Sequence, residues 1–168
     1  MYTIINGEFI NAADAKIAIT DLSIQRGYGV FDFFKVINQR PFYLHDHLDR
    51  LYRSASAMRL NLAITRGELE HIIQQLIEMN QLADAGIRIT ITGGYAEDGY
   101  SISKPNLLIT QIPLLVTTGM ANGLRLITYE HQRQLPHVKT IDYLQAIYLQ
   151  AHIKEQQADD VLYHYNGE

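Results

Sequence analysis

The stretch Pro136-His-Val-Lys-Thr-Ile-Asp-Tyr-Leu-Gln-Ala-Ile-Tyr-Leu-Gln-Ala-His152 joins a loop that contains a proline to a segment with helical apolar spacing. It puts Lys139 at the predicted start of a helix that runs to about Gln156. A lysine attacks a carbonyl only when its amine is neutral, and the positive end of a helix dipole disfavours an ammonium group. The stretch therefore indicates a nucleophilic lysine, and the plainer alternative is an ordinary solvated lysine at a helix start.

The segments on either side of this helix read as strands. Leu124–Tyr129 precedes it and Asp160–Tyr165 follows it, which predicts a strand–helix–strand unit. Asn166-Gly167 is a hairpin-turn signal, like Asn6-Gly7 near the start of the chain, but only Glu168 follows it. We therefore expect a chain that is cut off in the middle of a hairpin, with a frayed natural terminus as the alternative.

The earlier part of the chain reads as strands, then helices, then strands again. A hairpin is predicted around Asn6-Gly7, and a second one across Asn38-Gln39. The other predicted strands are Lys16–Thr20, Ile87–Thr92 and Asn106–Ile112, and Asp21–Gly29 is predicted as a loop. Apolar residues at helical spacing predict a helix from Leu44 to about Leu60, and the capping box Thr65-x-x-Glu68 opens another. The order predicts a mixed α+β fold, with a linker at Leu115–Asn122.

The composition excludes several functional classes. The 168 residues carry a net charge of −4 without a long run of either sign, which argues against a nucleic-acid-binding face. No apolar run reaches the length of a membrane span, and the N-terminus does not read as a signal peptide. There are no cysteines, so disulfides and thiolate chemistry are excluded. The seven histidines lack a metal-ligand spacing, so we predict no metal. Without a membrane span, a signal peptide or cysteines, the prediction is a soluble cytoplasmic protein.

Arg50 is the second candidate site residue. On the predicted first helix, His47, Arg50 and Ser54 share one side, apart from the apolar stripe. A guanidinium on a rigid helix beside two hydrogen-bonding groups is suited to binding a phosphate. The alternative is a solvated arginine in a surface charge pattern.

Three segments together resemble one family: His47-Leu-Asp-Arg-Leu-Tyr-Arg-Ser-Ala55, Gly27-Tyr-Gly-Val-Phe-Asp-Phe-Phe-Lys35 and Val138-Lys-Thr-Ile-Asp-Tyr-Leu144. They look like the class IV aminotransferases, the fold-type IV pyridoxal-phosphate enzymes that include branched-chain and D-amino-acid aminotransferases and aminodeoxychorismate lyase. The resemblance covers almost the whole chain. It implies a small N-terminal α/β domain, residues 1–118, and the beginning of a larger cofactor-binding domain, residues 119–168.

The resemblance also implies roles for individual residues. Lys139 matches the Schiff-base lysine and Arg50 matches the arginine that binds the phosphate of pyridoxal 5'-phosphate. The substrate, an amino acid or a 2-oxo acid, would contact Phe31, Arg88 and Tyr100. The family's carboxylate for the pyridinium nitrogen would lie beyond Glu168, so this chain alone is expected to hold the cofactor poorly.

The resemblance leaves the substrate open. Asp98 and Tyr100 stand where D-amino-acid enzymes have an arginine and a histidine, which speaks against D-amino-acid transamination. Arg88 matches a substrate contact of branched-chain enzymes, whereas Asp98-Gly-Tyr-Ser101 is similar to the corresponding loop of aminodeoxychorismate lyase. The main expectation is an aminotransferase that forms a homodimer, and the alternatives are a lyase of the same family or a non-catalytic relative.

Overall fold

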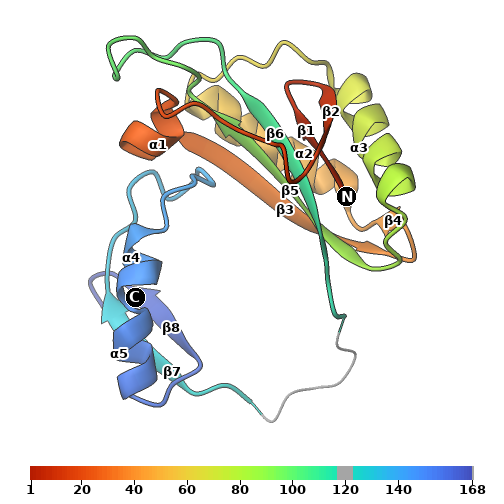
Figure 1. The fold of residues 1–168 in the computed structure, drawn as a ribbon. Coiled ribbons are helices and arrows are strands. Elements are labelled where there is room, and N and C mark those ends of the chain that lie inside the picture. The colour runs from red at the N-terminus through yellow and green to blue at the C-terminus, as the bar shows by residue number, and fades with distance from the viewer. Residues whose placement is uncertain (117–122, 168) are drawn as a thin grey trace. The chain divides into compact units, whose positions relative to one another are not determined.

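The computed structural model describes residues 1–116 and 123–167, which belong to two compact units (Figure 1). The first unit is Met1–Val116 together with Val138–Asp142, and the described residues of the second are 123–137 and 143–167. Strands and helices together confirm the predicted α+β class. The predicted boundary between residues 118 and 119 lies outside the described residues and stays a prediction.

An antiparallel sheet with the strand order β2-β1-β6-β5-β3-β4 forms the centre of the first unit. Both predicted hairpins are confirmed. Asn6 and Gly7 turn with φ of 53° and 89°, and Asn38 and Gln39 with φ of 49° and 60°, as two-residue hairpin turns require. The strand bounds are β1 Tyr2–Ile5, β2 Glu8–Asn11, β3 Gly29–Ile37, β4 Arg40–Pro41, β5 Ala85–Thr92 and β6 Leu107–Pro113.

Two helices, α2 (Leu44–Ala57) and α3 (Arg66–Asn80), cover one face of this sheet (Figure 1). Both were predicted, and the capping box of Thr65 and Glu68 at the start of α3 is confirmed. Because side chains alternate along a strand, every second residue of β3 and β5 faces these helices. The apolar side chains that meet there are buried and form the core, among them Val30, Phe34, Val36, Leu48, Leu51, Leu69, Ile73, Leu76, Ile87, Ile89 and Ile91.

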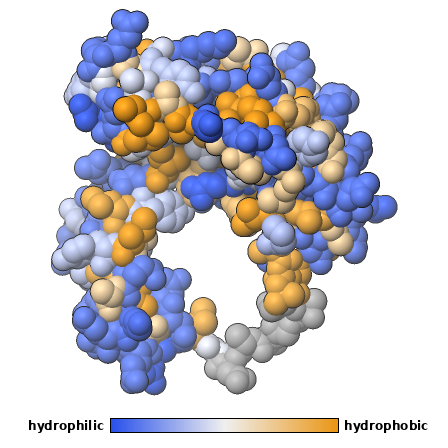
Figure 2. Space-filling model, viewed as in Figure 1, coloured by the Kyte–Doolittle hydropathy of each residue, from blue (hydrophilic) through white to orange (hydrophobic). Residues whose placement is uncertain are grey.

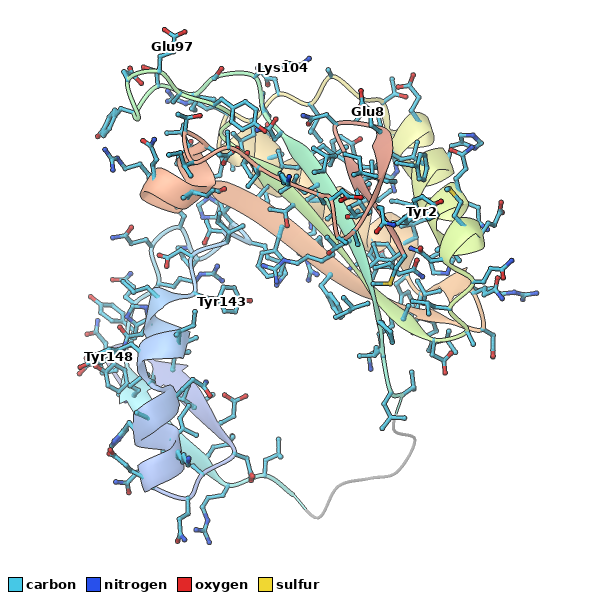
Figure 3. All side chains as sticks on the ribbon, in the orientation of Figure 1. Tyr2, Glu8, Glu97, Lys104, Tyr143 and Tyr148 are labelled. Carbon is cyan, nitrogen blue, oxygen red and sulfur yellow. The ribbon has the colours of Figure 1, made fainter. Side chains whose placement is uncertain are left out.

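The second unit contains a parallel strand pair. β7 (Leu126–Glu130) pairs with β8 (Asp160–His164), with Leu126 opposite Asp160. A parallel pair needs a crossover connection, and α4 (Leu144–Tyr148) and α5 (Gln150–Glu155) lie within it. This confirms the predicted strand–helix–strand order. Tyr148 of α4 points outward in Figure 3, with 74% of its surface exposed.

Three of the predicted elements are wrong. Lys16–Thr20 is not a strand, and Ile19 within it is 80% exposed. Asp21–Gly29 is not only a loop, because α1 (Leu22–Arg26) forms there: the Asp21 side chain accepts the Ser23 N–H, and Gly27 ends the helix at φ 65°. The helix predicted from Lys139 begins only at Leu144.

The face of the first unit that Figure 2 shows is mostly hydrophilic, with hydrophobic patches between the hydrophilic areas. The residues that lead from the end of β6 toward the undescribed segment are among the hydrophobic ones, and Ile112 and Leu115 are 50% and 88% exposed. No helix in residues 1–116 or 123–167 is long and apolar enough to cross a membrane.

Candidate functional site

Lys139 lies in a short extended segment that adds to the edge of β3. The Phe31 N–H donates to the Lys139 carbonyl at 3.0 Å, and the Ile141 N–H donates to the Gly29 carbonyl at 3.0 Å. On the other side, the Lys139 N–H donates to the Ser54 hydroxyl on α2 at 3.2 Å. The backbone of Lys139 is therefore held between a strand and a helix, and the helix-start position predicted for it is wrong.

The amine of Lys139 lies over an aromatic ring that a second cation shares. Its Nζ is 4.3 Å from the centre of the Phe31 ring, and the guanidinium carbon of Arg88 is 3.9 Å from the same centre. Phe33 is paired with Arg88 across the strands, so Phe31 and Arg88 project from the same face of the sheet, opposite α2 and α3. Phe31 is buried, with 4% of its surface exposed.

Two positive charges at one ring make this face suited to an anion. Each cation is attracted to the ring face, but the two charges repel each other, and a bound carboxylate would relieve that repulsion. Among the ion pairs of the described residues, none includes Lys139 or Arg88. The structure thus brings together Phe31, Arg88 and Lys139, three of the five predicted site residues.

Arg50 binds a buried carboxylate on the other face of the same strand. Its Nε donates to Asp32 Oδ2 at 2.8 Å and its Nη2 donates to Asp32 Oδ1 at 2.9 Å, a bidentate pair. Asp32 is fully buried, whereas the Arg50 side chain is 45% exposed. Burial raises the pKa of the Asp32 carboxyl, but the hydrogen bonds from Arg50 and His47 outweigh burial and hold this pKa below its ordinary value.

His47 completes this cluster. Its Nδ1 lies 2.8 Å from Asp32 Oδ1, and because an ionised carboxylate only accepts hydrogen bonds, Nδ1 carries the hydrogen. Of the three α2 residues predicted to share one side, His47 and Arg50 bind Asp32, and Ser54 accepts from the Lys139 N–H.

Tyr100 lies apart from these groups. It belongs to the loop between β5 and β6, is 81% exposed, and contacts none of the other four candidates in the part of the chain that the structure describes. Its backbone N–H donates to Asp98. The hydroxyl of Ser101, and then the backbone N–H groups of Ser101 and Tyr100, lower the pKa of Asp98 to about 2. In Figure 3, Glu97 and Lys104 of the same loop point away from the sheet.

A hollow of about 590 Å³ in the first unit lies elsewhere. The Asn6-Gly7 turn, the start of α3 near Gly67 and the loop at Lys104 line it, together with apolar side chains such as Leu62 and Ile72. None of the five predicted site residues lines it, and Asn6 already bonds to Asn106 and Leu107. The candidate site is therefore the face at Phe31, with the Lys139 amine and the Arg88 guanidinium, together with the Arg50 guanidinium that binds Asp32.

Asp32 was not among the site residues predicted from the sequence. A signal for it existed, since Asp32 is the single acid in the row Val30, Asp32, Phe34 and Val36, whose other members are apolar and face the core. A charge at such a position is costly unless a partner neutralises it, which is a reason to search for a cation nearby.

The comparisons with known proteins agree on one family. The model of the amino-transferase class IV family matches residues 29–168. A protein of Methanocaldococcus jannaschii that carries the name of a branched-chain-amino-acid aminotransferase is 30% identical over 85% of this chain and 52% of its own length. D-alanine aminotransferase of Staphylococcus haemolyticus is 32% identical over 61% of this chain and 36% of its own length.

A solved structure supports the fold. A hypothetical aminotransferase from Mycobacterium tuberculosis, solved in its PLP-bound form, superposes with a TM-score of 0.80 at 20% identity, over 99% of this chain and 62% of that protein. The chain thus spans about half or less of the curated relatives named here. Because the family model matches most of its residues, the chain belongs to the class IV aminotransferase family.

Proposed function

We propose that the protein is a pyridoxal-phosphate-dependent aminotransferase that moves an amino group from an amino acid to a 2-oxo acid, with Lys139 as its catalytic lysine. The observation that carries this proposal is how Lys139 is held. Its N–H donates to Ser54 on α2, the helix that also bears Arg50, and its amine lies over Phe31. Membership of the class IV family and the PLP-bound relative support the same activity.

The side chains fit the two ends of this cofactor. Arg50 is permanently charged and nearly half exposed, so its guanidinium suits the phosphate, while Lys139 supplies a primary amine for the aldehyde. Arg50 and Lys139 contact successive residues of β3, Asp32 and Phe31, and both are tied to α2. Asp32 and Phe31 face opposite sides of the sheet, and the link between the two groups is Ser54, which lies one helical turn after Arg50 and accepts from the Lys139 N–H.

Lys139, Arg88 and Phe31 each contribute to the proposed reaction. When bound, the cofactor supplies the electron sink for the charge left at the substrate Cα. Lys139 Nζ accepts the proton that leaves this carbon, Arg88 attracts the substrate carboxylate, and the ring of Phe31 excludes water from one side. Tyr100 stays a predicted substrate contact from the loop. The 1–118 and 119–168 domains, a homodimer and a cytoplasmic location belong to the same proposal.

Trapping of the cofactor tests the proposal. The protein as its gene encodes it is incubated with pyridoxal 5'-phosphate, reduced with borohydride and analysed by mass spectrometry. One covalent adduct on the peptide that contains Lys139 is expected. Lys139→Ala should abolish it, while Lys104→Ala, at an exposed lysine of the same unit, should retain it.

Activity provides the second measurement. With a panel of amino donors and 2-oxoglutarate, we expect Lys139→Ala to lower turnover by about 10²–10⁴-fold, the usual contribution of a positioned acid–base group. An adduct that forms equally in Lys139→Ala, or an unmodified protein that forms none and transfers no amino group, would refute the proposal. Pyruvate release from aminodeoxychorismate without transamination would identify the lyase instead.

A further inference from the structure

A buried acid on β3, Asp32, takes no direct part in the reaction proposed for Lys139, Arg88 and Phe31. Asp32 is fully buried, and its neighbours on the core-facing side of the strand, Val30 and Phe34, are 0% and 1% exposed. Removing a charge from water costs several kcal/mol unless partners compensate for it. Asp32 has those partners: Arg50 donates twice, His47 once and the Phe33 backbone N–H once.

The pairing fixes the guanidinium of Arg50. Nε and Nη2 form one edge of that planar group, and both donate to Asp32. A bidentate bond sets the plane of the group as well as its position, so the opposite edge, at Nη1, is directed away from Asp32. The 45% exposure of the side chain indicates that a ligand can reach this arginine.

His47 holds the same carboxylate from a second direction. It lies three residues before Arg50 on α2, donates to Asp32 Oδ1, and its ring packs at 5.5 Å from the ring of Phe34. Nη2 of Arg50 lies 3.2 Å from His47 Nδ1 because both donate to the same oxygen. Rotation of the carboxylate would break hydrogen bonds from both side chains at once, so the orientation is well determined.

We propose that Asp32 is the positioning residue of the phosphate site: it holds Arg50 by the Nε–Nη2 edge, so that the outer edge of the guanidinium is oriented for the cofactor phosphate before binding. This inference rests on the proposed function. An arginine that samples many rotamers loses up to about 2 kcal/mol of side-chain entropy on binding, and Asp32 removes that cost in advance.

If the Asp32–Arg50 ion pair were purely structural, Asp32→Asn would change the phosphate affinity in the opposite direction. If Asp32 only attached α2 to the sheet, its negative charge beside Arg50 would weaken anion binding by Coulomb repulsion. Asp32→Asn keeps the size of the side chain and removes the charge. If the pair is purely structural, phosphate affinity should therefore rise in this variant. If Asp32 positions Arg50, the same substitution lowers phosphate affinity, because Arg50 is released.

The experiment compares two ligands that differ only in the phosphate. Affinities for pyridoxal 5'-phosphate and for pyridoxal are measured by borohydride trapping on Lys139 over a range of ligand concentrations. For Asp32→Asn we expect the affinity for pyridoxal 5'-phosphate to fall at least tenfold, with little change for pyridoxal. Asp49→Asn, on the same helix but paired with Arg66, is the matched control and should change neither.

A double-mutant cycle shows whether Asp32 acts through Arg50. In an Arg50→Ala background, Asp32→Asn should have no further effect on the ratio of the two affinities. An unchanged or increased ratio in the single Asp32→Asn variant overturns the inference while leaving the proposed function intact. Failure of the unmodified protein to form an adduct with either ligand overturns both.

One measurement needs no variant and serves if Asp32→Asn does not fold. In ¹⁵N spectra of the unmodified protein, the Arg50 Nε–H signal should be protected from exchange and should keep its position when pyridoxal 5'-phosphate is added, while the Nη signals move. Movement of the Nε signal on binding would mean that the phosphate displaces Asp32, which contradicts the inference.

Discussion

At the scale of single residues, two buried aspartates organise the polar interior of the first unit. Asp32 is balanced by a cation, whereas Asp21 accepts from neutral donors, namely the backbone and hydroxyl of Ser23, the hydroxyl of Thr92 and the amide of Asn106. These bonds connect α1, the end of β5 and the residue that precedes β6. Asp21 therefore fixes the base of the loop that carries Tyr100.

Asp21→Asn should destabilise the protein by about 2–3 kcal/mol, the cost of leaving buried polar groups unsatisfied. One oxygen becomes an NH₂ group, so it faces donors where it used to accept from Thr92 and Asn106, or from Ser23. Urea unfolding followed by circular dichroism measures the change. Asp14→Asn, at an exposed position, is the control, and equal midpoints for the two variants would contradict the role given to Asp21.

At the scale of elements, the sequence correctly predicted the turns and the helix cap that depend only on neighbouring residues. The turns at Asn6-Gly7 and Asn38-Gln39 and the capping box at Thr65 depend on a few adjacent residues, and all three are confirmed. Alternation alone predicted a strand at Lys16–Thr20, but a strand needs a partner. A short helix at Leu22–Arg26 was missed although Asp21 and Gly27 are a cap at each end.

Thr65→Ala should cost about 1 kcal/mol of stability, the usual value for loss of an N-cap. The Thr65 hydroxyl accepts from the Glu68 N–H, and the Glu68 carboxylate accepts from the Thr65 N–H at 2.8 Å, so the substitution removes half of a reciprocal cap. Denaturant unfolding measures the loss. His71→Ala, on the exposed side of the same helix, should change stability by no more than a few tenths of a kcal/mol, and a similar loss there would refute the cap argument.

At the scale of the whole molecule, the site depends on contacts between residues far apart in the chain, which spacing alone does not reveal. The motifs around Arg50 and Lys139 identified the family, yet the bidentate contact with Asp32 and the pairing of Lys139 with β3 come only from the folded structure. The helical apolar pattern predicts a helix from Lys139, because nothing local indicates that Val138–Asp142 belongs to the first unit. Those residues pair with the edge of β3 and therefore adopt an extended conformation.

Gly29→Ala tests whether the pairing of this segment with β3 positions Lys139. A Cβ at Gly29 would lie 2.7 Å from the Ile91 carbonyl oxygen and 3.1 Å from Ile141, so either β5 or the extended segment must move. We expect a loss of about 1–3 kcal/mol, as for overpacking elsewhere, and faster hydrogen exchange at the Ile141 amide, which donates to the Gly29 carbonyl. Adduct formation at Lys139 should fall as well.

Gly67→Ala is the matched control, because a Cβ there meets nothing within 4 Å and the residue is helical, so stability should rise by up to about 1 kcal/mol. If Ile141 exchanges as slowly in Gly29→Ala as in the unmodified protein while Lys139 still forms its adduct, then the lysine does not depend on the β3 edge for its position.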